Sequence, residues 1–373
     1  MQPVKFKCSK SSTLPEDLRN EVNGYFSNNK ISMYANKEMI FKVAFWLSCW
    51  VMTYITIILA KDNFLLAVCC GLAHMFTHVM IAFNITHDAN HDAIFKSKKW
   101  NTFFGYFIEM LGCSRNMWIL SHNQEHHTYI NVNEHDNNIE GYQLLRLTPE
   151  DKWLKHHKYQ WLYAPFVYGL STLNYATLRD FKMILKYSAS KKIKLSASFL
   201  AEFIFFKILY YSYVFLIPVL VFHVSIWIVL TYFLIGHFVN GLFLALIFVT
   251  GHLTEDTLYP NVENNVIDNN WSSHVIQTTG DYAVTMPFMQ WLVGGINLHV
   301  AHHLFPRICH VHYKKISPVI KNVVHKHGMV YREIPGFWGA LKSHFMLLKQ
   351  LGKTPIPVPV IKKTAPSFAE ASL

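Results

Sequence analysis

The sequence predicts an all-α integral membrane protein with four transmembrane helices arranged as two hairpins. Of its 373 residues, 51% are hydrophobic and only 15% are Asp, Glu, Lys or Arg, against about 25% charged residues in an ordinary soluble domain. Four apolar runs are long enough to cross a bilayer, which takes about 20 residues. The composition excludes a disordered chain, which has low hydrophobicity, and a disulfide scaffold, which has dense cysteine.

The first predicted hairpin joins a span at residues 40–60 to a span at residues 64–85. Only residues 61–63 separate the two spans, so they are expected to run antiparallel. Lys42 lies near the start of the first span, and its long side chain is expected to reach into the lipid head groups.

The second predicted hairpin joins spans at residues 199–222 and 226–249, again through a very short connection. Glu202 and Lys207 fall in the first turns of the third span. These are the charges that the two spans contain, and both lie near one end.

Lysine and arginine predict the orientation, because positive segments stay on the cytoplasmic side. Residues 1–39 contain six Lys+Arg, residues 86–198 contain fourteen and residues 250–373 contain eleven, whereas the two short connections contain only Lys61. Both termini and the long middle segment are therefore expected to be cytoplasmic, with residues 1–39 as a cytosolic segment and no signal peptide. The net charge of +11 suits anionic head groups or acidic partners, and no nucleic acid is expected, because no basic helix concentrates the charge.

The segments outside the spans are predicted from composition. Residues 103–111 and 161–178 are too short or too polar to span and are expected to lie in the interface as helices. Residues 351–373, with the Pro-rich stretch 354–366, are expected to be disordered. The cysteines are interpreted as packing residues. Cys8, Cys113 and Cys309 are expected in the reducing cytoplasm, and Cys49, Cys69 and Cys70 in the spans.

Three histidine clusters indicate a metal site among the 22 histidines. HDANH follows the second span, HNQEHH lies in the middle segment, and HVAHH follows the fourth span. Residues three or four apart share one face of a helix, so each cluster can direct its rings at one point. The candidate ligands are His87 and His91; His122, His126 and His127; and His299, His302 and His303.

Eight imidazoles exceed the four ligands of a tetrahedral ion, so two metal ions are the economical count. A cysteine-free, all-histidine set beside an apolar slab favours iron that activates dioxygen, because a lipid C–H bond offers no handle for acid or base chemistry. The other histidines are interpreted differently. Four lie in or between the spans and are interpreted as structural or channel-lining: His74, His78, His223 and His237. The remainder are interpreted as solvated or ordinary polar residues: His156, His157, His310, His312, His135, His325, His327 and His344.

Over residues 15–350 the chain resembles the membrane fatty acid desaturases, through THDANHDA, NMWILSHNQEHHTYIN, NNWSSHVIQTTGDYA and GGINLHVAHHLFPRICHVHY. The likeness is greatest to the bacterial linoleoyl-CoA, or front-end, type. It implies a desaturase domain at residues 40–350, in which a cytosolic helical cap on the four spans holds a diiron centre beside an acyl tunnel. It also implies an O2-dependent enzyme that introduces a cis double bond into a long-chain acyl-CoA or acyl-lipid. Front-end enzymes of the delta-5 or delta-6 type would be examples of this activity.

The resemblance adds five site residues. The family uses nine histidines, and TGHLTE supplies His252 as the ninth; spacing alone does not favour it over His274. Four acidic residues in or beside the boxes could orient ligand imidazoles, as metal-bound histidines generally require: Asp88, Glu125, Asp136 and Glu255.

Two departures from the front-end pattern affect the interpretation. His299 stands where front-end enzymes usually have Gln, which weakens the inference about the double-bond position. The HPGG haem motif is absent, so electrons are expected from a separate ferredoxin or cytochrome b5-type donor, for which the basic cytosolic face is a plausible dock. The protein would lie in the inner or plasma membrane of a bacterium, or in the endoplasmic reticulum of a eukaryote.

Two alternatives remain open. A hydroxylase of the same superfamily differs only in the second step of the reaction. A histidine-rich metal transporter would place ionisable ligands near the bilayer midplane, but the predicted spans contain no Asp or Glu except Glu202.

Overall fold

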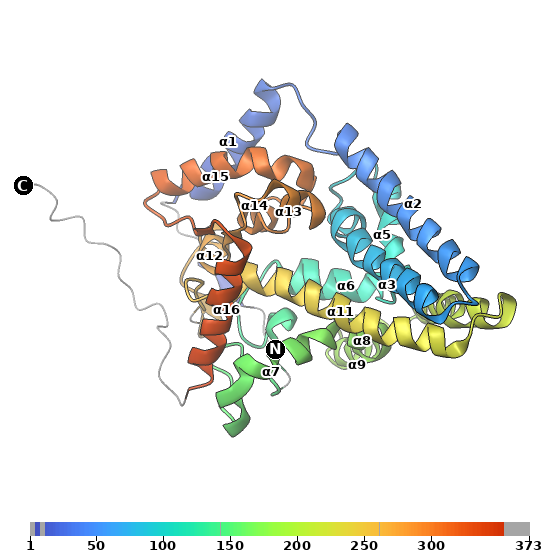
Figure 1. Ribbon diagram of the computed structural model, residues 1–373. Coiled ribbons are helices and arrows are strands. Elements are labelled where there is room, and N and C mark those ends of the chain that lie inside the picture. Colours follow the sequence, from blue (N-terminus) through green and yellow to red (C-terminus); the bar gives the residue numbers. More distant parts are fainter. Residues whose placement is uncertain (1–3, 8–11, 142, 261, 354–373) are drawn as a thin grey trace, which may run out of the picture.

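The computed structural model describes residues 4–7, 12–141, 143–260 and 262–353 (Figure 1). The chain is mostly helical, with four helices long and apolar enough to cross a membrane. In Figure 1 three of these long helices, α2, α3 and α11, run toward one side, while α12 to α16 gather at the other. The predicted fold class is confirmed.

The first hairpin consists of α2 (Lys37–Leu59) and α3 (Phe64–Ile81). Helix α3 continues without a break through the π-helix η1 (Ala82–Thr86) into α4 (His87–Asn90), so the membrane-length helix spans Phe64–Asn90. It extends beyond the predicted end at residue 85 and includes the first residue of the first histidine cluster.

An asparagine caps each helix of this hairpin. The side chain of Asn36 accepts from the backbone N–H of Met39, and that of Asn63 from Leu66, both at 3.0 Å. Such caps satisfy backbone donors that a helix start leaves unpaired. The sequence Lys61 to Asn63 therefore ends one helix and starts the next.

The second hairpin consists of α10 (Ala197–Tyr211), its π-helical continuation η7 (Ser212–Val221) and α11 (Ile226–His252). Pro218 lies inside η7. Proline has no N–H to donate, so the regular α-helical ladder cannot continue there. Helix α11 packs against α3, which joins the two hairpins.

Two lysines predicted near the membrane surface are buried. Lys42 is fully buried, so the expectation that it reaches into the head groups is wrong. Lys207 is also buried and forms an ion pair with Asp180 at 2.8 Å. A charge can be buried only when it is paired and hydrogen-bonded.

Three histidines inside the membrane helices are structural. His74 contacts Thr53 Oγ1 at 3.2 Å, His78 contacts Tyr213 Oη at 3.1 Å, and His237 contacts Tyr210 Oη at 3.1 Å. All three rings are buried. These contacts hold the spans to one another.

Shorter helices fill the segment between the hairpins. They are α5 (Lys98–Gly105), η2 (Tyr106–Leu111), α6 (Arg115–Trp118), η3 (Ile119–His126), η4 (Asn137–Ile139), η5 (Lys155–Tyr159), α7 (Gln160–Gly169), α8 (Ser171–Asn174), η6 (Tyr175–Arg179) and α9 (Asp180–Ala189). The stretches predicted as interfacial helices are helical, and α7 and α8 pack along α11. Their depth in the membrane stays a prediction.

The segment after α11 forms a helical body with α1 (Leu14–Asn28). Its helices are α12 (Trp271–Thr278), α13 (Pro287–Leu292), α14 (His299–Leu304), η8 (His310–His312), α15 (Tyr313–Lys326) and α16 (Phe337–Leu351). Leu14, Leu18, Val22 and Phe26 recur on one face of α1 and are buried in the same core as α15. The N-terminal segment is thus part of the folded body.

Within the described residues, five two-residue strands complete the fold. They are β1 (Lys5–Phe6), β2 (Val262–Glu263), β3 (Val266–Ile267), β4 (Asp281–Tyr282) and β5 (Glu333–Ile334). Strand β3 pairs with β1 in parallel and with β2 antiparallel, and β4 pairs with β5 in parallel. The pair β4–β5 ties the start of α14 to α16.

The predicted tail begins too early. Leu351 is the last residue of α16, is buried, and accepts a hydrogen bond from Arg146 Nη1 at 2.9 Å through its carbonyl. Gly352 O accepts from Trp153 Nε1. Residues 354–373 and Cys8 lie outside the described residues; the other five cysteines are free thiols.

Candidate metal centre

Nine buried histidines gather at the ends of two membrane helices. His87 begins α4 at the end of the α3 helix, and His252 is the last residue of α11. The others come from the residue after α4, from η3 and its end, and from α14: His91, His122, His126, His127, His299, His302 and His303. Helix C-termini carry partial negative charge, so the two long helices favour a cation at this point.

The rings form overlapping groups whose nitrogens could share a metal ion. One group is His87, His91, His122 and His302; a second is His126, His252 and His303; a third, His127, His302 and His303, connects them. His299 joins the second group through His252. The three sequence clusters and His252 therefore converge.

A π-helix aligns the second cluster. In η3 the N–H of His127 donates to the carbonyl of His122 at 3.0 Å, which is the i to i+5 bond of a π-helix. This wider turn places residues five apart on one face. The Nε2 atoms of His122 and His127 accordingly lie 3.2 Å apart.

The third cluster lies on α14, whose first turn is held by Asp281. Val300 N donates to Asp281 Oδ1 at 2.9 Å, and Tyr331 Oη donates to Asp281 Oδ2 at 2.6 Å. Helix α11 approaches this turn closely, since a Cβ at Gly251 would lie 2.5 Å from the ring of His299. Only glycine allows the two elements to meet at this distance.

Two ring nitrogens face each other without a proton between them. His299 Nδ1 donates to Ile296 O at 2.8 Å, and His252 Nδ1 donates to Thr278 O at 3.3 Å. Both Nε2 atoms are therefore unprotonated in neutral rings, yet they lie 2.6 Å apart. Opposed lone pairs repel, so this arrangement calls for a cation between or beside them.

Burial lowers the pKa of five of these rings. Desolvation lowers the pKa of His299 to about 3. Desolvation, followed by neighbouring imidazoles, holds the pKa of four other rings well below the usual value: His122, His127, His302 and His303. Neutral imidazole is the form that binds metals.

Several of these rings leave a nitrogen without a hydrogen-bond partner among the described residues. The unpaired atoms include His87 Nε2, His91 Nε2, His126 Nε2 and His302 Nε2. Buried polar atoms are almost always hydrogen-bonded. The set of unpaired nitrogens therefore fits metal ligation better than packing.

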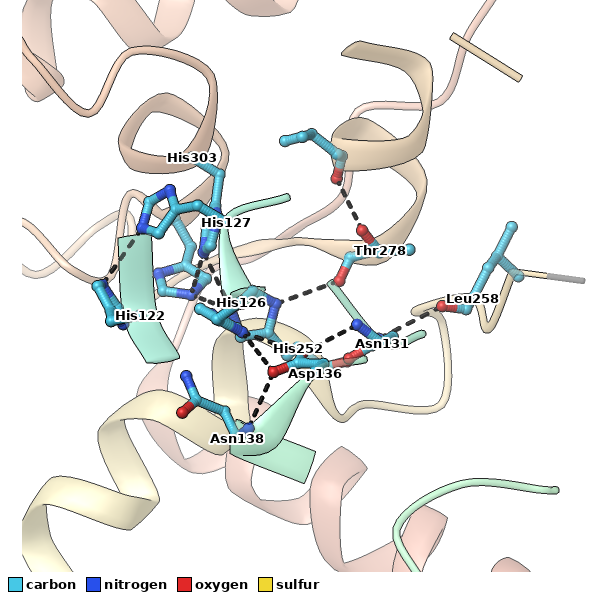
Figure 2. Close-up of polar contacts among 12 residues, drawn as sticks. His122, His126, His127, Asn131, Asp136, Asn138, His252, Leu258, Thr278 and His303 are labelled. Carbon is cyan, nitrogen blue, oxygen red and sulfur yellow. Dashed lines mark hydrogen bonds and ion pairs between the residues drawn. The ribbon is translucent and has the colours of Figure 1, made fainter. Parts of the chain in front are cut away.

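The carboxylate of Asp136 contacts one of the rings. Its carboxylate accepts from His126 Nδ1 at 3.0 Å and from the backbone N–H groups of Asn131 and Asn138 (Figure 2). Figure 2 also shows the Asn131 side chain reaching the carbonyls of His252 and Leu258. Asp136 thus fixes the Nδ1–H tautomer of His126 and leaves its Nε2 free for a metal.

The other acidic residues lie in different surroundings. Asp88 lies 3.6 Å from His87 Nδ1, so its role in orienting that ring stays a prediction. Glu125 instead accepts from Tyr187 Oη at 2.6 Å and pairs with Lys192, which ties η3 to the end of α9. Glu255 is exposed and accepts from Gln350, so it orients no ring.

Geometry separates His252 from His274. His274 is buried, but it contacts Phe6 and belongs to none of the histidine groups in the described chain. Its helix, α12, contacts the ring of His252 through Thr278 O. His252 therefore lies within the cluster, and its role as a ligand stays a prediction.

Three histidines predicted to be solvated are buried. His157 contacts Gln143 O at 2.9 Å, His312 contacts Tyr34 O at 2.9 Å, and His310 contacts Asp88. His156 is exposed, as expected. Tyr313, whose Oη is 3.4 Å from His302 Nδ1, is a further neighbour that the sequence pattern did not reveal. Its place directly after CHVH gave no signal, because the contact depends on how α15 folds back onto α14.

The centre has an apolar side and a polar side. Trp118 stacks on His122 with ring centroids 4.3 Å apart, and Phe248 lies edge-on to both His122 and His299. On another side His91 and His127 line a cavity of about 290 Å³ together with polar and charged residues that include Asp92 and Arg307. The cluster therefore has both an apolar neighbourhood and an aqueous approach.

The fatty acid desaturase family model matches residues 62–335, which include all nine histidines. The chain belongs to the fatty acid desaturase family. It is a membrane desaturase and an oxidoreductase. Among its relatives is the sn-1 linoleoyl-lipid 6-desaturase of Synechocystis, 32% identical over 345 residues, or 90% of this chain and 94% of that protein.

Two eukaryotic proteins are similar to the desaturase over nearly the same region. The acyl-lipid (8-3)-desaturase of Physcomitrium patens is 29% identical and covers 90% of this chain and 71% of its own length. The probable Delta(5) fatty acid desaturase C of Dictyostelium discoideum is 30% identical, with 91% and 75% covered.

Proposed function

We propose that the desaturase binds two iron ions through its nine clustered histidines and introduces a cis double bond into a long acyl chain. The observation that carries this proposal is the opposed Nε2 pair of His252 and His299, at 2.6 Å, within a set of unpaired ring nitrogens. The three histidine groups overlap at His302 and His303, and nine imidazoles exceed the ligands that one ion takes. All-nitrogen coordination suits iron.

The two irons would supply the reduction of dioxygen, for which a separate ferredoxin or cytochrome b5-type donor provides two electrons. Two C–H bonds on adjacent methylenes break and one C=C bond forms, so the substrate gives the other two electrons. With two protons from solvent, the four electrons convert O2 to two waters. The balance requires an electron donor, and the cavity beside His91 and His127 is the polar approach available to it.

The protein residues bind, orient and exclude water. Asp136 and the carbonyls of Ile296 and Thr278 fix the tautomers of His126, His299 and His252. Trp118 presents apolar surface to His122, and Phe248 presents it to His299. A methylene group placed there would meet the centre without competing water.

The substrate proposal is a linoleoyl-type acyl-lipid with front-end regiochemistry. The relatives above are named a linoleoyl-lipid 6-desaturase, an acyl-lipid (8-3)-desaturase and a probable Delta(5) fatty acid desaturase. The first two names favour a lipid-bound chain over acyl-CoA. His299 stands where front-end enzymes usually have Gln, so the position of the double bond needs direct measurement.

Expression in a host fed with linoleate tests the function. Fatty acid methyl esters should contain a new cis-unsaturated product, found in membrane lipids before it appears in acyl-CoA. The His122→Ala variant should form none, whereas the exposed His156→Ala should match the wild type. A hydroxylated ester in place of the alkene would contradict the proposed desaturation. Product that appears first in acyl-CoA would contradict the proposal that the substrate chain is bound to a lipid.

Metal analysis tests the cofactor. The purified wild-type protein should contain about two irons per chain, as its nine histidines suggest. Full activity with stoichiometric zinc and no iron would contradict the assignment.

A further inference from the structure

Lys42 is an unusual residue for a membrane helix because its side chain is fully buried. Its ammonium group donates to Trp291 O at 2.7 Å and lies 2.8 Å from His310 Nε2. Lysine is almost never fully buried unless it is paired. The carbonyl and the imidazole accept from two of its three N–H donors, and neither carries a negative charge.

The negative charge lies on the far side of His310. His310 Nδ1 is 2.8 Å from Asp88 Oδ2, and the backbone N–H of His310 donates to the same oxygen at 2.9 Å. Lysine can only donate, so His310 Nε2 accepts and Nδ1–H donates to Asp88. Burial and the Lys42 ammonium lower the pKa of His310, which agrees with a neutral ring in this tautomer.

The chain of contacts ends at the metal centre. The other oxygen of Asp88, Oδ1, lies 3.6 Å from His87 Nδ1, and neither nitrogen of His87 has a hydrogen-bond partner among the described residues. His87 Nε2 belongs to the histidine groups. Carboxylates that hold a ligand histidine by its second nitrogen set its tautomer and its basicity.

We propose that Lys42 and His310 are positioning residues for His87, acting through Asp88. The pair holds the Asp88 carboxylate toward His87 Nδ1, and the ammonium offsets the carboxylate charge beside the metal centre. This inference rests on the proposed function, because it takes His87 as a metal ligand. Lys42 belongs to the first span, His310 to η8, and Asp88 to α4, so the chain links three distant segments to one ligand.

A separate metal site is the alternative for these residues. Asp88, Cys309 and His310 could also group around a cation. However, the Lys42 ammonium is already 2.8 Å from His310 Nε2 and would repel a second cation. Because His310 Nε2 accepts from Lys42, Nδ1 carries the proton and donates to Asp88, so it offers no lone pair to such a cation.

The test uses the full-length protein in detergent and Co²⁺ as the probe. Lys42→Met removes the charge and keeps the length of the side chain; His310→Ala removes the relay ring. Each should weaken Co²⁺ binding by about 10–100-fold, the usual effect of losing such a partner, and should alter the Co²⁺ visible spectrum. Both residues act through Asp88. The double variant should therefore bind Co²⁺ with an affinity no lower than that of the single variant with the lower affinity.

Lys207→Met is the matched control. Lys207 is also a buried lysine in a membrane helix, but it pairs with Asp180, away from the histidines. This variant should bind Co²⁺ with wild-type affinity and spectrum even if its stability falls. In the iron-loaded protein, the reduction potential should fall in Lys42→Met, because a positive charge is lost, and should not change in Lys207→Met.

The outcomes separate the inference from the proposed function. A wild-type protein that binds fewer than two ions contradicts the proposed function itself. The positioning role is overturned if the wild type binds two ions and the Lys42→Met and Lys207→Met variants have the same Co²⁺ affinity and spectrum. A third ion in the wild type, bound more tightly in Lys42→Met, overturns it in favour of a metal site at Asp88, Cys309 and His310.

Discussion

At the scale of single residues, the carboxylate of Asp136 shows how a metal ligand can be held before a metal arrives. It receives three donors from His126, Asn131 and Asn138, and an amide at this position would direct N–H groups at one of them. Asp136→Asn should therefore lower metal affinity by about 10–100-fold. Equilibrium binding of Co²⁺ to the purified variant measures the loss.

The control for Asp136→Asn is Glu255→Gln. Glu255 is exposed and contacts Gln350, so its substitution should leave metal binding unchanged. Equal affinities for the two variants would show that Asp136 does not orient a ligand.

His299 provides a second test at the same scale. The amide oxygen of His299→Gln can still face a metal, although it is a weaker donor, whereas His299→Ala offers no donor. Gln should keep partial activity and Ala should lose nearly all of it. Yields and positions of the double bond, read from methyl ester derivatives, decide this; equal and near-wild-type yields would remove His299 from the site.

The sequence predicted the ligand residues better than it predicted their partners. Clusters such as His299, His302 and His303 are visible because helical spacing is local. Lys42 with His310 and His302 with Tyr313 are contacts that only the folded chain brings together. A lone lysine near a span end is most often solvated by head groups, so its burial could not be inferred from its position.

At the scale of elements, the close approach of α11 to α14 depends on Gly251. A Cβ there would press on the His299 ring at 2.5 Å, within the buried centre. Gly251→Ala should displace the ring, with a cost of about 1–3 kcal/mol typical of overpacking. The expected result is weaker metal binding, measured by Co²⁺ titration, in a chain that still inserts into membranes.

Gly24→Ala is the counterpart of this change. Gly24 lies in α1 with open space around its Cβ position, and alanine favours helices by about 1 kcal/mol over glycine. It should leave metal binding unchanged. Wild-type metal affinity in Gly251→Ala would show that α11 can move away without disturbing His299.

The elements also show where sequence patterns reach their limit. The long spans were predicted because about 20 apolar residues specify a membrane helix. The π-helical turns η1 and η3 were not, since no residue pattern marks the extra residue in the turn. Yet η3 brings His127 level with His122, so an element invisible in the sequence completes a site that the sequence revealed.

At the scale of the whole molecule, the metal centre should act as a cross-link. Its ligands come from the ends of α3 and α11, from η3 and from α14. Metal binding stabilises a folded state by about 2.7 kcal/mol when free metal is 100 times Kd. The metal-loaded protein should therefore melt at a higher temperature than the chelator-stripped protein in thermal unfolding.

A variant that lacks several ligands gives the reference for this melting experiment. His122→Ala combined with His302→Ala should melt at the same temperature with and without metal. A metal-independent melting temperature in the wild type would mean that the histidines do not join these elements through an ion.

The orientation of the molecule is a further prediction. Positive charge is scarce at the Lys61 end of the hairpins, so this end should lie outside the cytoplasm. The histidines lie at the opposite end, so the centre should face the cytoplasm. An epitope tag inserted between Lys61 and Asp62 should bind antibody on intact spheroplasts of an expressing bacterium. An N-terminal tag should bind only after permeabilisation; the reverse pattern would invert the topology.

The contact between Lys42 and His310 also sets an order of events during synthesis. Lys42 leaves the ribosome 268 residues before its partner, a delay of roughly 10–50 s at about 5–20 residues per second. Throughout that time the first hairpin must reside in the bilayer with an uncompensated ammonium, which a long side chain near a helix end can hold among the head groups. Burial of Lys42 and closure of the histidine centre therefore happen late, and a metal ion can be loaded only into a chain that is nearly complete.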